Sequence, residues 1–263
     1  MPEETNPDDS AATLTEHLAE LRKRLIVCCW AIGIGFAASY SFSKELFHLL
    51  MLPLANVMPE QSSMIFTGLT EGFFTYLKVA FIAGIMLSSP VIFYQLWAFI
   101  APGLYSSEKK YVLPFTFFSA FFFVGGAIFG YFVVFPFAFE FFMSFNTEDI
   151  KALPSMREFL AFSMKLLIAF GVAFELPLFI VLLSKIGIVT IEGLTKNRKY
   201  VIVGAFIVAA ILTPPDVVTQ VLMAFPLMLL YEMGIIGARL FGKKKGPAEA
   251  VNQTIKKESS KNG

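Results

Sequence analysis

The chain has 263 residues, of which 56% are hydrophobic and 16% charged, and its mean hydropathy is +0.69. A soluble domain of this length does not need so much apolar surface, so the composition indicates an integral membrane protein and excludes an ordinary soluble one. The net charge of +1 gives no indication of nucleic-acid binding.

The first 24 residues are polar and acidic and predict no cleavable signal peptide. They instead predict an amphipathic cytoplasmic helix at the membrane surface, with four leucines on one stripe: Leu14, Leu18, Leu21 and Leu25. Glu20 lies on a different face of that helix. Its simplest structural role is an ion pair with Arg24, four residues later, which stabilises a helix by only about 0.3–0.5 kcal/mol.

Six segments are predicted to cross the membrane, since about 20 apolar residues in a helix span the hydrocarbon core. They are residues 25–42, 73–99, 111–139, 159–183, 200–212 and 217–236. The fifth would reach only about 20 Å, so it either thins the bilayer or packs inside the protein. Prolines in or near the spans predict kinked, bowed helices: Pro90, Pro136, Pro177 and Pro226.

The sequence between the spans predicts the domain organisation. A cytoplasmic N-terminal segment (1–24) precedes a six-helix transmembrane domain (25–238), in which two long connections (44–72 and 140–158) form an external cap. A Lys-rich cytoplasmic tail (239–263) is predicted to be disordered.

Basic residues predict the orientation. If the N-terminus is cytoplasmic, 16 of the 21 Lys and Arg residues fall on the cytoplasmic side of a six-span arrangement. This is a positive-inside distribution, and an even number of spans then places both termini in the cytoplasm.

The first cytoplasmic connection carries an acid at a helix start. Pro102 and Gly103 end the second span, and Ser106 or Ser107 can cap the third. Glu108 then falls in the first turn of that helix, where the helix dipole favours a carboxylate. A simple helix-start acid is therefore the structural interpretation of Glu108.

Glu175 is the lone carboxylate in the apolar run 166–183. A charge at mid-membrane costs on the order of 3 kcal/mol, so such a residue usually has a task or a partner. Pro177 removes a backbone donor and loosens the helix beside it. From the residues alone, Glu175 is either a structural carboxylate bonded to a neighbouring helix or a functional group, such as the carrier of a proton- or ion-coupled transporter.

The residues needed for catalysis or metal binding are scarce. The two cysteines, Cys28 and Cys29, are adjacent in the first span, and the two histidines, His17 and His48, lie outside the spans. These positions offer no zinc set, no HExxH helix and no intramembrane Ser–His dyad. We therefore expect no cofactor, no metal and no enzymatic activity.

Four motifs, in this order among six spans, resemble the TatC family, the polytopic subunit of the twin-arginine protein translocase. The motifs are His17-Leu-x-Glu20-Leu-Arg-x-Arg24, Phe99-Ile-Ala-Pro-Gly-Leu-Tyr105 with Glu108, Phe170-Gly-Val-x-Phe-Glu175-x-Pro177, and Thr213-Pro-Pro-Asp216 with Gln220. The resemblance covers residues 14–241.

The resemblance implies a receptor for signal peptides that carry paired arginines. Glu20 and Glu108 would receive the two guanidinium groups, because Arg donates two parallel hydrogen bonds to a carboxylate and Lys cannot. The site would be flanked by Phe99, Leu104 and Tyr105.

The resemblance also implies partners within the membrane. Glu175, Asp216 and Gln220 would contact partner helices, namely TatA- and TatB-like single-span subunits, and further copies of the chain would join a larger complex. The implied location is the cytoplasmic (inner) membrane, and the implied driving force is the proton motive force. A transporter that uses Glu175 remains the alternative, although a proton relay normally needs several acids.

Overall fold

The computed structural model describes residues 7–59, 63–66, 68–100, 112–147, 153–213 and 216–241, with side chains from His17 onward. These residues are helical apart from turns and one isolated parallel bridge between Ile65 and Ser155. The elements are α1 (Pro7–Tyr40), α2 (Ser43–Ala55), α3 (Glu71–Ile100), α4 (Val112–Phe129), the π-helical η3 (Gly130–Val134), α5 (Phe135–Met143), α6 (Met156–Phe174), α7 (Leu176–Lys185), α8 (Ile191–Lys196), α9 (Arg198–Leu212) and α10 (Val217–Phe241).

Four helical stretches among the described residues are long and apolar enough to cross a membrane: α3, α4 to α5, α6 to α7, and α10. The pair α1 and α2 qualifies as a fifth if the two helices, bent by 83°, count as one span. The all-helical membrane fold predicted from the sequence is therefore confirmed, and each of the six predicted segments is helical. The fifth, α9, has 15 residues, or about 22 Å of helix, and is the short one.

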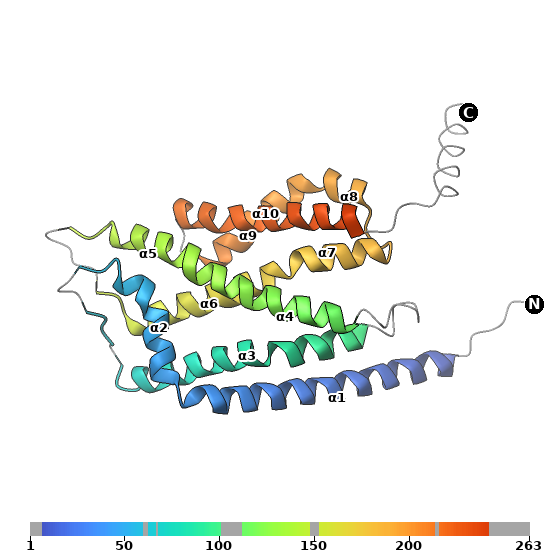
Figure 1. Ribbon diagram of the computed structural model, residues 1–263, viewed down its shortest axis with the longest axis horizontal. Coiled ribbons are helices and arrows are strands. Elements are labelled where there is room, and N and C mark those ends of the chain that lie inside the picture. Colours follow the sequence, from blue (N-terminus) through green and yellow to red (C-terminus); the bar gives the residue numbers. More distant parts are fainter. Residues whose placement is uncertain are drawn as a thin grey trace, which may run out of the picture.

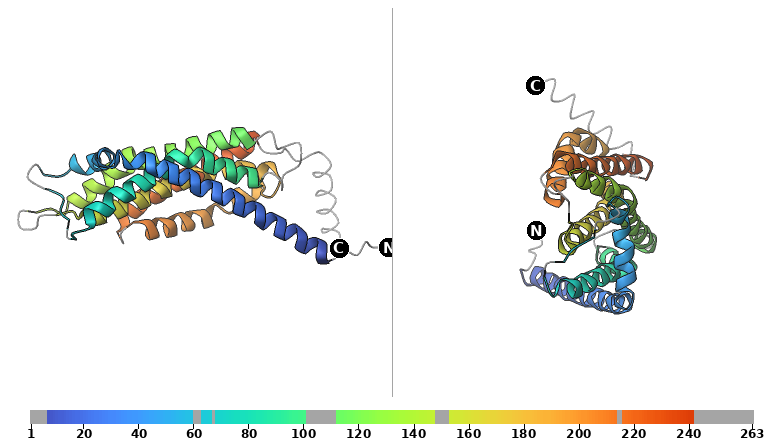
Figure 2. Two further views of the ribbon diagram at one scale, coloured as in Figure 1. Left: turned by 90° about the horizontal axis from the view of Figure 1, so that it is seen from below. Right: turned by 90° about the vertical axis from the view of Figure 1, so that its left-hand side faces the viewer.

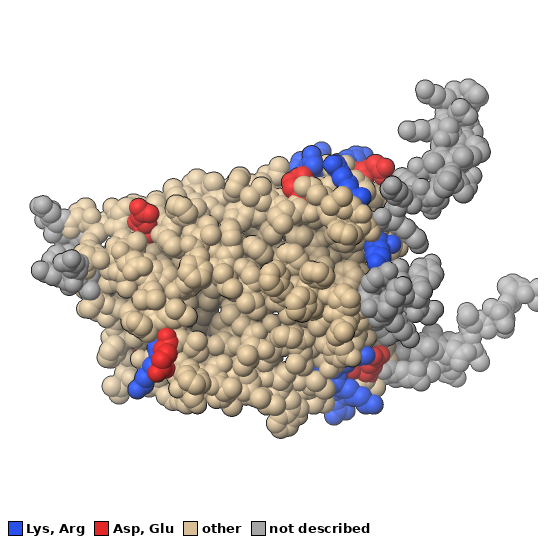
Figure 3. Space-filling model, in the orientation of Figure 1, with Lys and Arg blue, Asp and Glu red and all other residues tan. Residues whose placement is uncertain are grey.

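The long helices lie side by side in an order that can be followed in Figure 1 and Figure 2. α1 packs on α3, α3 on α4 and α4 on α6, after which α7 packs on α10 and α10 on α9. We call the end at which α1 begins and α10 finishes the termini end, and the opposite end, where α1 meets α2 and α3 begins, the cap end. On the face shown in Figure 3, charged side chains gather toward these two ends and leave an apolar belt between them, as expected for a surface in lipid.

The first helix extends across the boundary that the sequence predicts at residue 24. α1 runs without a break from Pro7 to Tyr40, so no helix end separates the segment 1–24 from the span predicted to begin at Leu25. A single unbroken helix cannot lie along the membrane surface up to residue 24 and cross the membrane from residue 25. The boundary at residue 24 therefore does not coincide with a helix end, and the division of the chain there stays a prediction.

The two connections predicted to form the cap are joined to each other. Met156 donates its backbone N–H to Ile65 O at 2.8 Å, and Ile65 donates its own to Pro154 O at 3.1 Å. Glu71, in the first turn of α3, accepts from the Arg157 backbone N–H at 2.6 Å, where α6 begins. These bonds fix the start of α3 against the start of α6.

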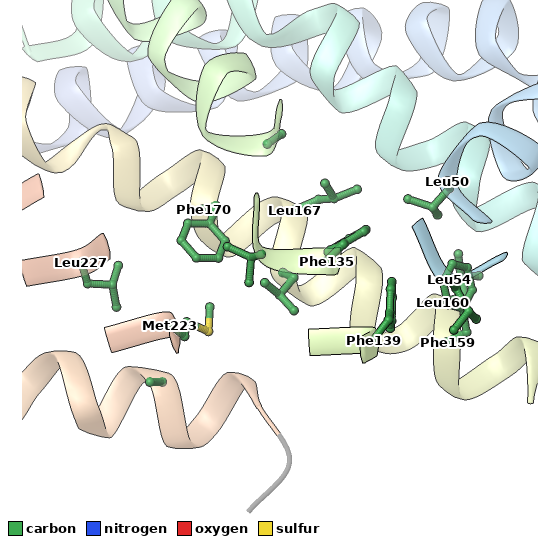
Figure 4. Packing of buried hydrophobic residues seen from close by; sticks show 14 of the residues in the cluster. Leu50, Leu54, Phe135, Phe139, Phe159, Leu160, Leu167, Phe170, Met223 and Leu227 are labelled. Atoms are coloured by element: carbon green, nitrogen blue, oxygen red, sulfur yellow. The ribbon is translucent and has the colours of Figure 1, made fainter. Parts of the chain in front are cut away.

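Phenylalanines fill the core between α5, α6 and η3 (Figure 4). Phe135 and Phe170 are fully buried, and Phe139 packs on Phe159 with ring centroids 5.5 Å apart. Without a hydrophobic force between lipid-embedded helices, such close packing is what holds them together.

The prolines affect their helices differently. α3 is continuous through Pro90, and the hydroxyl of Ser89 donates to Met86 O at 2.8 Å. That carbonyl is the one that Pro90, which lacks an N–H, leaves without its helical donor. Pro136 instead lies in the first turn of α5, just after the π-helical η3. Pro177 lies in the first turn of α7, just after the helix break at Glu175.

Candidate functional site

The C-terminal half of α1 packs against the middle of α3 at a close helix crossing. Gly35 and Gly84 face each other so closely that a Cβ on Gly35 would lie 2.6 Å from Gly84 O. One turn away, Ser88 donates its hydroxyl to Ala31 O at 2.7 Å. Small residues that let two backbones approach are typical of membrane helix pairs. This crossing brings the start of α1 to the end of α3.

Glu20 and Arg24 meet near that end of the pair. Arg24 donates to Glu20 Oε1 from Nη2 at 2.5 Å and from Nε at 3.0 Å, so the structural ion pair expected from the sequence is present. Arg24 also donates through Nη1 to Gln95 Oε1 on α3 at 3.2 Å. Glu20 Oε2 accepts no hydrogen bond from any described residue. Within the described residues, Oε1 of Glu20 is thus occupied by Arg24, whereas Oε2 can accept a hydrogen bond from a ligand.

Phe99 lies next to this ion pair in the fold. Its ring stacks on His17 of α1, with centroids 4.3 Å apart and planes 23° from parallel. The structure thus brings Glu20 and Phe99, which the sequence places 79 residues apart, into one region at the termini end. Leu104, Tyr105 and Glu108 lie outside the described residues, in the segment 101–111 that follows α3 directly.

Glu175 lies at the joint between α6 and α7 and is only 4% exposed. Neither of its carboxylate oxygens has a hydrogen-bond partner among the described residues. The side chain that interacts with this carboxylate is Ser119 of α4, whose oxygen also accepts from Trp97 Nε1 at 2.8 Å. The predicted weak point beside Pro177 is therefore present, and the carboxylate points into the protein rather than toward lipid.

Asp216 and Gln220 lie where α9 gives way to α10. Asp216 caps α10: Oδ1 accepts from the Thr219 backbone N–H at 2.7 Å, and Oδ2 accepts from the Thr219 hydroxyl. Gln220 donates through Nε2 to Phe206 O on α9 at 3.1 Å. Asp216 therefore fixes the start of α10, and Gln220 joins α10 to α9.

Sequence reasoning missed one neighbour of the Glu20 region, Gln95. Gln95 lies four residues before Phe99, on the same face of α3, and this spacing was the signal that could have identified it. His17 was recognised only as part of a motif, because its stacking on Phe99 depends on how α1 meets α3.

Known proteins of one family are similar to this chain over most of its length. The family model for "Sec-independent protein translocase protein (TatC)" matches residues 16–226. A protein of that name from Desulforapulum autotrophicum is 51% identical over 256 residues, which cover 96% of this chain and 95% of the relative. One from Escherichia coli (strain K12) is 42% identical over 248 residues, 94% of this chain and 96% of the relative.

Solved structures match as well. A crystal structure of the twin arginine translocase receptor TatC superposes with a TM-score of 0.76 at 42% identity, covering 85% of this chain and 98% of the other. A crystal structure of the same receptor in DDM gives a TM-score of 0.78 at 41% identity, with coverages of 87% and 100%.

Proposed function

The chain belongs to the TatC family of Sec-independent protein translocase proteins, and from this membership we propose that it binds Arg-Arg signal peptides at the termini end of its bundle. It is a membrane-embedded translocase subunit. We place it in the cytoplasmic membrane with both termini inside, because most of its Lys and Arg residues then lie on the cytoplasmic side.

One observation carries the proposal: Glu20 has a free oxygen beside Phe99, at the end of α3 from which the segment with Glu108 continues. An incoming guanidinium binds Glu20 Oε2, while Arg24 keeps Oε1 or turns to Gln95. The second guanidinium binds Glu108. Phe99, Leu104 and Tyr105 accept the apolar side chain that follows the arginines.

Partner helices, of the TatA and TatB type, dock along α9 and α10. Both helices expose apolar side chains at neighbouring levels, among them Val203, Ile207 and Ile211 on α9 and Val218, Val221 and Phe225 on α10. Gln220 supports this surface by joining α10 to α9, and Asp216 supports it by capping α10. Because α9 is shorter than the hydrocarbon core, the bilayer must thin beside it. A partner helix that packs on α9 replaces lipid at this position.

Glu175 is the intramembrane polar contact of the assembled complex. A buried carboxylate without a hydrogen-bond partner is costly in the free chain, and it lies at a helix break where the backbone can move. Pairing with a polar group of a partner helix or of an inserted signal peptide relieves that cost. No enzymatic step and no cofactor is part of this function.

Export of a folded cargo tests the receptor role. In cells that depend on this chain, Glu20→Ala and Glu108→Ala should each block export of an Arg-Arg cargo while the protein stays inserted at normal levels. Glu232→Ala is the matched control, because Glu232 also forms an exposed ion pair, with Arg198 at 2.6 Å, and should leave export unchanged. Normal export with both Glu20 and Glu108 replaced would refute the proposal.

A further inference from the structure

A second polar site lies at the cap end, away from the Glu20 region. It is a pocket of about 310 Å³ between the first turns of α3 and α6, lined in part by Thr70, Glu71, Phe74, Lys78, Arg157 and Leu160. Its volume is at the lower end of the range for small-molecule sites. It combines two cations, a carboxylate, a hydroxyl and apolar side chains.

Two cations of the pocket have no partner within the described part of the chain. Lys78 on α3 and Arg157 on α6 are both exposed, and neither side chain makes an ion pair or hydrogen bond with a described residue. Elsewhere, Arg24 and Arg198 each have a carboxylate. The pocket therefore gathers two cations that form no ion pair with a described residue.

Glu71 does not neutralise them, because its oxygens are engaged with other donors. Oε1 accepts from the Arg157 backbone N–H at 2.6 Å and from the Ser155 hydroxyl at 3.3 Å, and Oε2 accepts from the Gly68 N–H at 3.1 Å. Glu158, the next acid along α6, does not line the pocket. Counting both cations and Glu71, the pocket keeps a net charge of +1.

The position of Lys78 indicates where its partner must lie. Lys78 follows Glu71 by seven residues, which places its backbone about 10 Å farther along the α3 axis, inside a stretch apolar enough to span the membrane. A lysine at this depth extends its flexible side chain toward the interface to keep its ammonium out of hydrocarbon. That direction leads to the first turn of α6 and Arg157. Both cations line the same pocket, and we expect it to lie at the level of the lipid phosphates.

We propose that this pocket binds the headgroup phosphodiester of an anionic phospholipid in the leaflet at the cap end. Lys78 and Arg157 hold the phosphate, Thr70 offers a hydroxyl, and Phe74 and Leu160 contact the start of the acyl chains. By contacting Lys78 on α3 and Arg157 on α6, the lipid links the two helices where the hydrogen bond from Arg157 N–H to Glu71 also links them. This inference does not depend on the proposed signal-peptide site, which lies at the opposite end.

Native mass spectrometry of the full chain in detergent tests the proposal with added phosphatidylglycerol. The wild-type protein should retain phosphatidylglycerol in preference to phosphatidylcholine. The Lys78→Gln/Arg157→Gln variant should bind it about tenfold more weakly, since each basic residue near a membrane surface contributes severalfold. Lys44→Gln, which removes an exposed lysine of α2 at the cap end outside this pocket, should bind like wild type.

A variant with the cations exchanged, Lys78→Arg/Arg157→Lys, keeps both charges and should retain the lipid. Unfolding curves of all the variants in lipid-free detergent should coincide, because the replaced side chains are exposed. Equal lipid retention by wild type and Lys78→Gln/Arg157→Gln would overturn the proposal. Displacement of the lipid by millimolar inorganic phosphate would also overturn it, because the pocket would then select a free anion.

Discussion

The carboxylate of Glu20 has two oxygens in different situations. Arg24 occupies Oε1 with two nitrogens and at the same time reaches Gln95, so the ion pair joins α1 to α3. A partly buried pair between residues four apart on one helix contributes only about 0–1 kcal/mol to stability. A ligand's guanidinium can therefore compete for the carboxylate without unfolding the helix pair. The structural and functional interpretations of Glu20 are compatible.

Replacing Glu175 with Leu should stabilise the isolated chain and weaken the complex. Removing a buried carboxylate with no hydrogen-bond partner relieves a desolvation cost of about 1–3 kcal/mol. Thermal unfolding of the purified variant in detergent should therefore shift upward. Single-span partners should co-purify in reduced amount, because the polar contact is lost. A lower unfolding temperature, or unchanged recovery of the partners, would contradict the role assigned to Glu175.

At the scale of elements, the close crossing of α4 and α6 depends on glycine in both helices, Gly126 on α4 and Gly171 on α6. A Cβ on Gly126 would lie 2.3 Å from the Phe170 carbonyl oxygen, whereas one on the adjacent Gly125 would meet nothing within 4 Å. We expect Gly126→Ala to destabilise the protein by about 1–3 kcal/mol or to force the helices apart. Gly125→Ala should be neutral or slightly stabilising. The measurement is thermal unfolding of both variants in the same detergent, and equal midpoints would argue against the close crossing.

The sequence predicted the helices better than their irregularities. Hydrophobic runs identified all six segments, including the short α9, and the pair Glu175 and Pro177 marked the break between α6 and α7. The π-helical turn η3 was missed, because its closing bond from the Phe135 N–H to Gly130 O depends on how the helix adapts to Pro136. The continuity of α1 was also missed, since a change from polar to apolar residues says nothing about a helix end.

For the candidate site, the sequence predicted which residues take part but not which residues contact one another in the fold. A motif suggested Glu20 and Phe99, but only packing of α1 on α3 shows that they share one region with His17 and Gln95. The burial of Glu175 was not predictable either. An isolated acid in a span can face lipid, a partner or the protein core, and these cases have the same local pattern.

At the scale of the whole molecule, the two ends of the bundle differ in how they are held. At the cap end, Glu71 and the bridge between Ile65 and Ser155 join the starts of α3 and α6. At the termini end, α1 and α3 are joined by Arg24 and by the stacking of His17 on Phe99. The cap end is therefore fixed by hydrogen bonds that backbone N–H groups donate between the starts of α3 and α6. The termini end, where we propose that the signal peptide binds, is joined only by side-chain contacts between α1 and α3 among the described residues.

The most direct test is binding of a labelled Arg-Arg signal peptide to the purified chain in detergent, measured against its Lys-Lys counterpart. We expect the Arg-Arg peptide to bind at least about tenfold more tightly, because the guanidinium fork pairs with a carboxylate as an ammonium cannot. The preference should disappear with Glu20→Ala or Glu108→Ala and persist with Glu232→Ala. Equal binding of the two peptides, or a preference that survives loss of both carboxylates, would contradict the account.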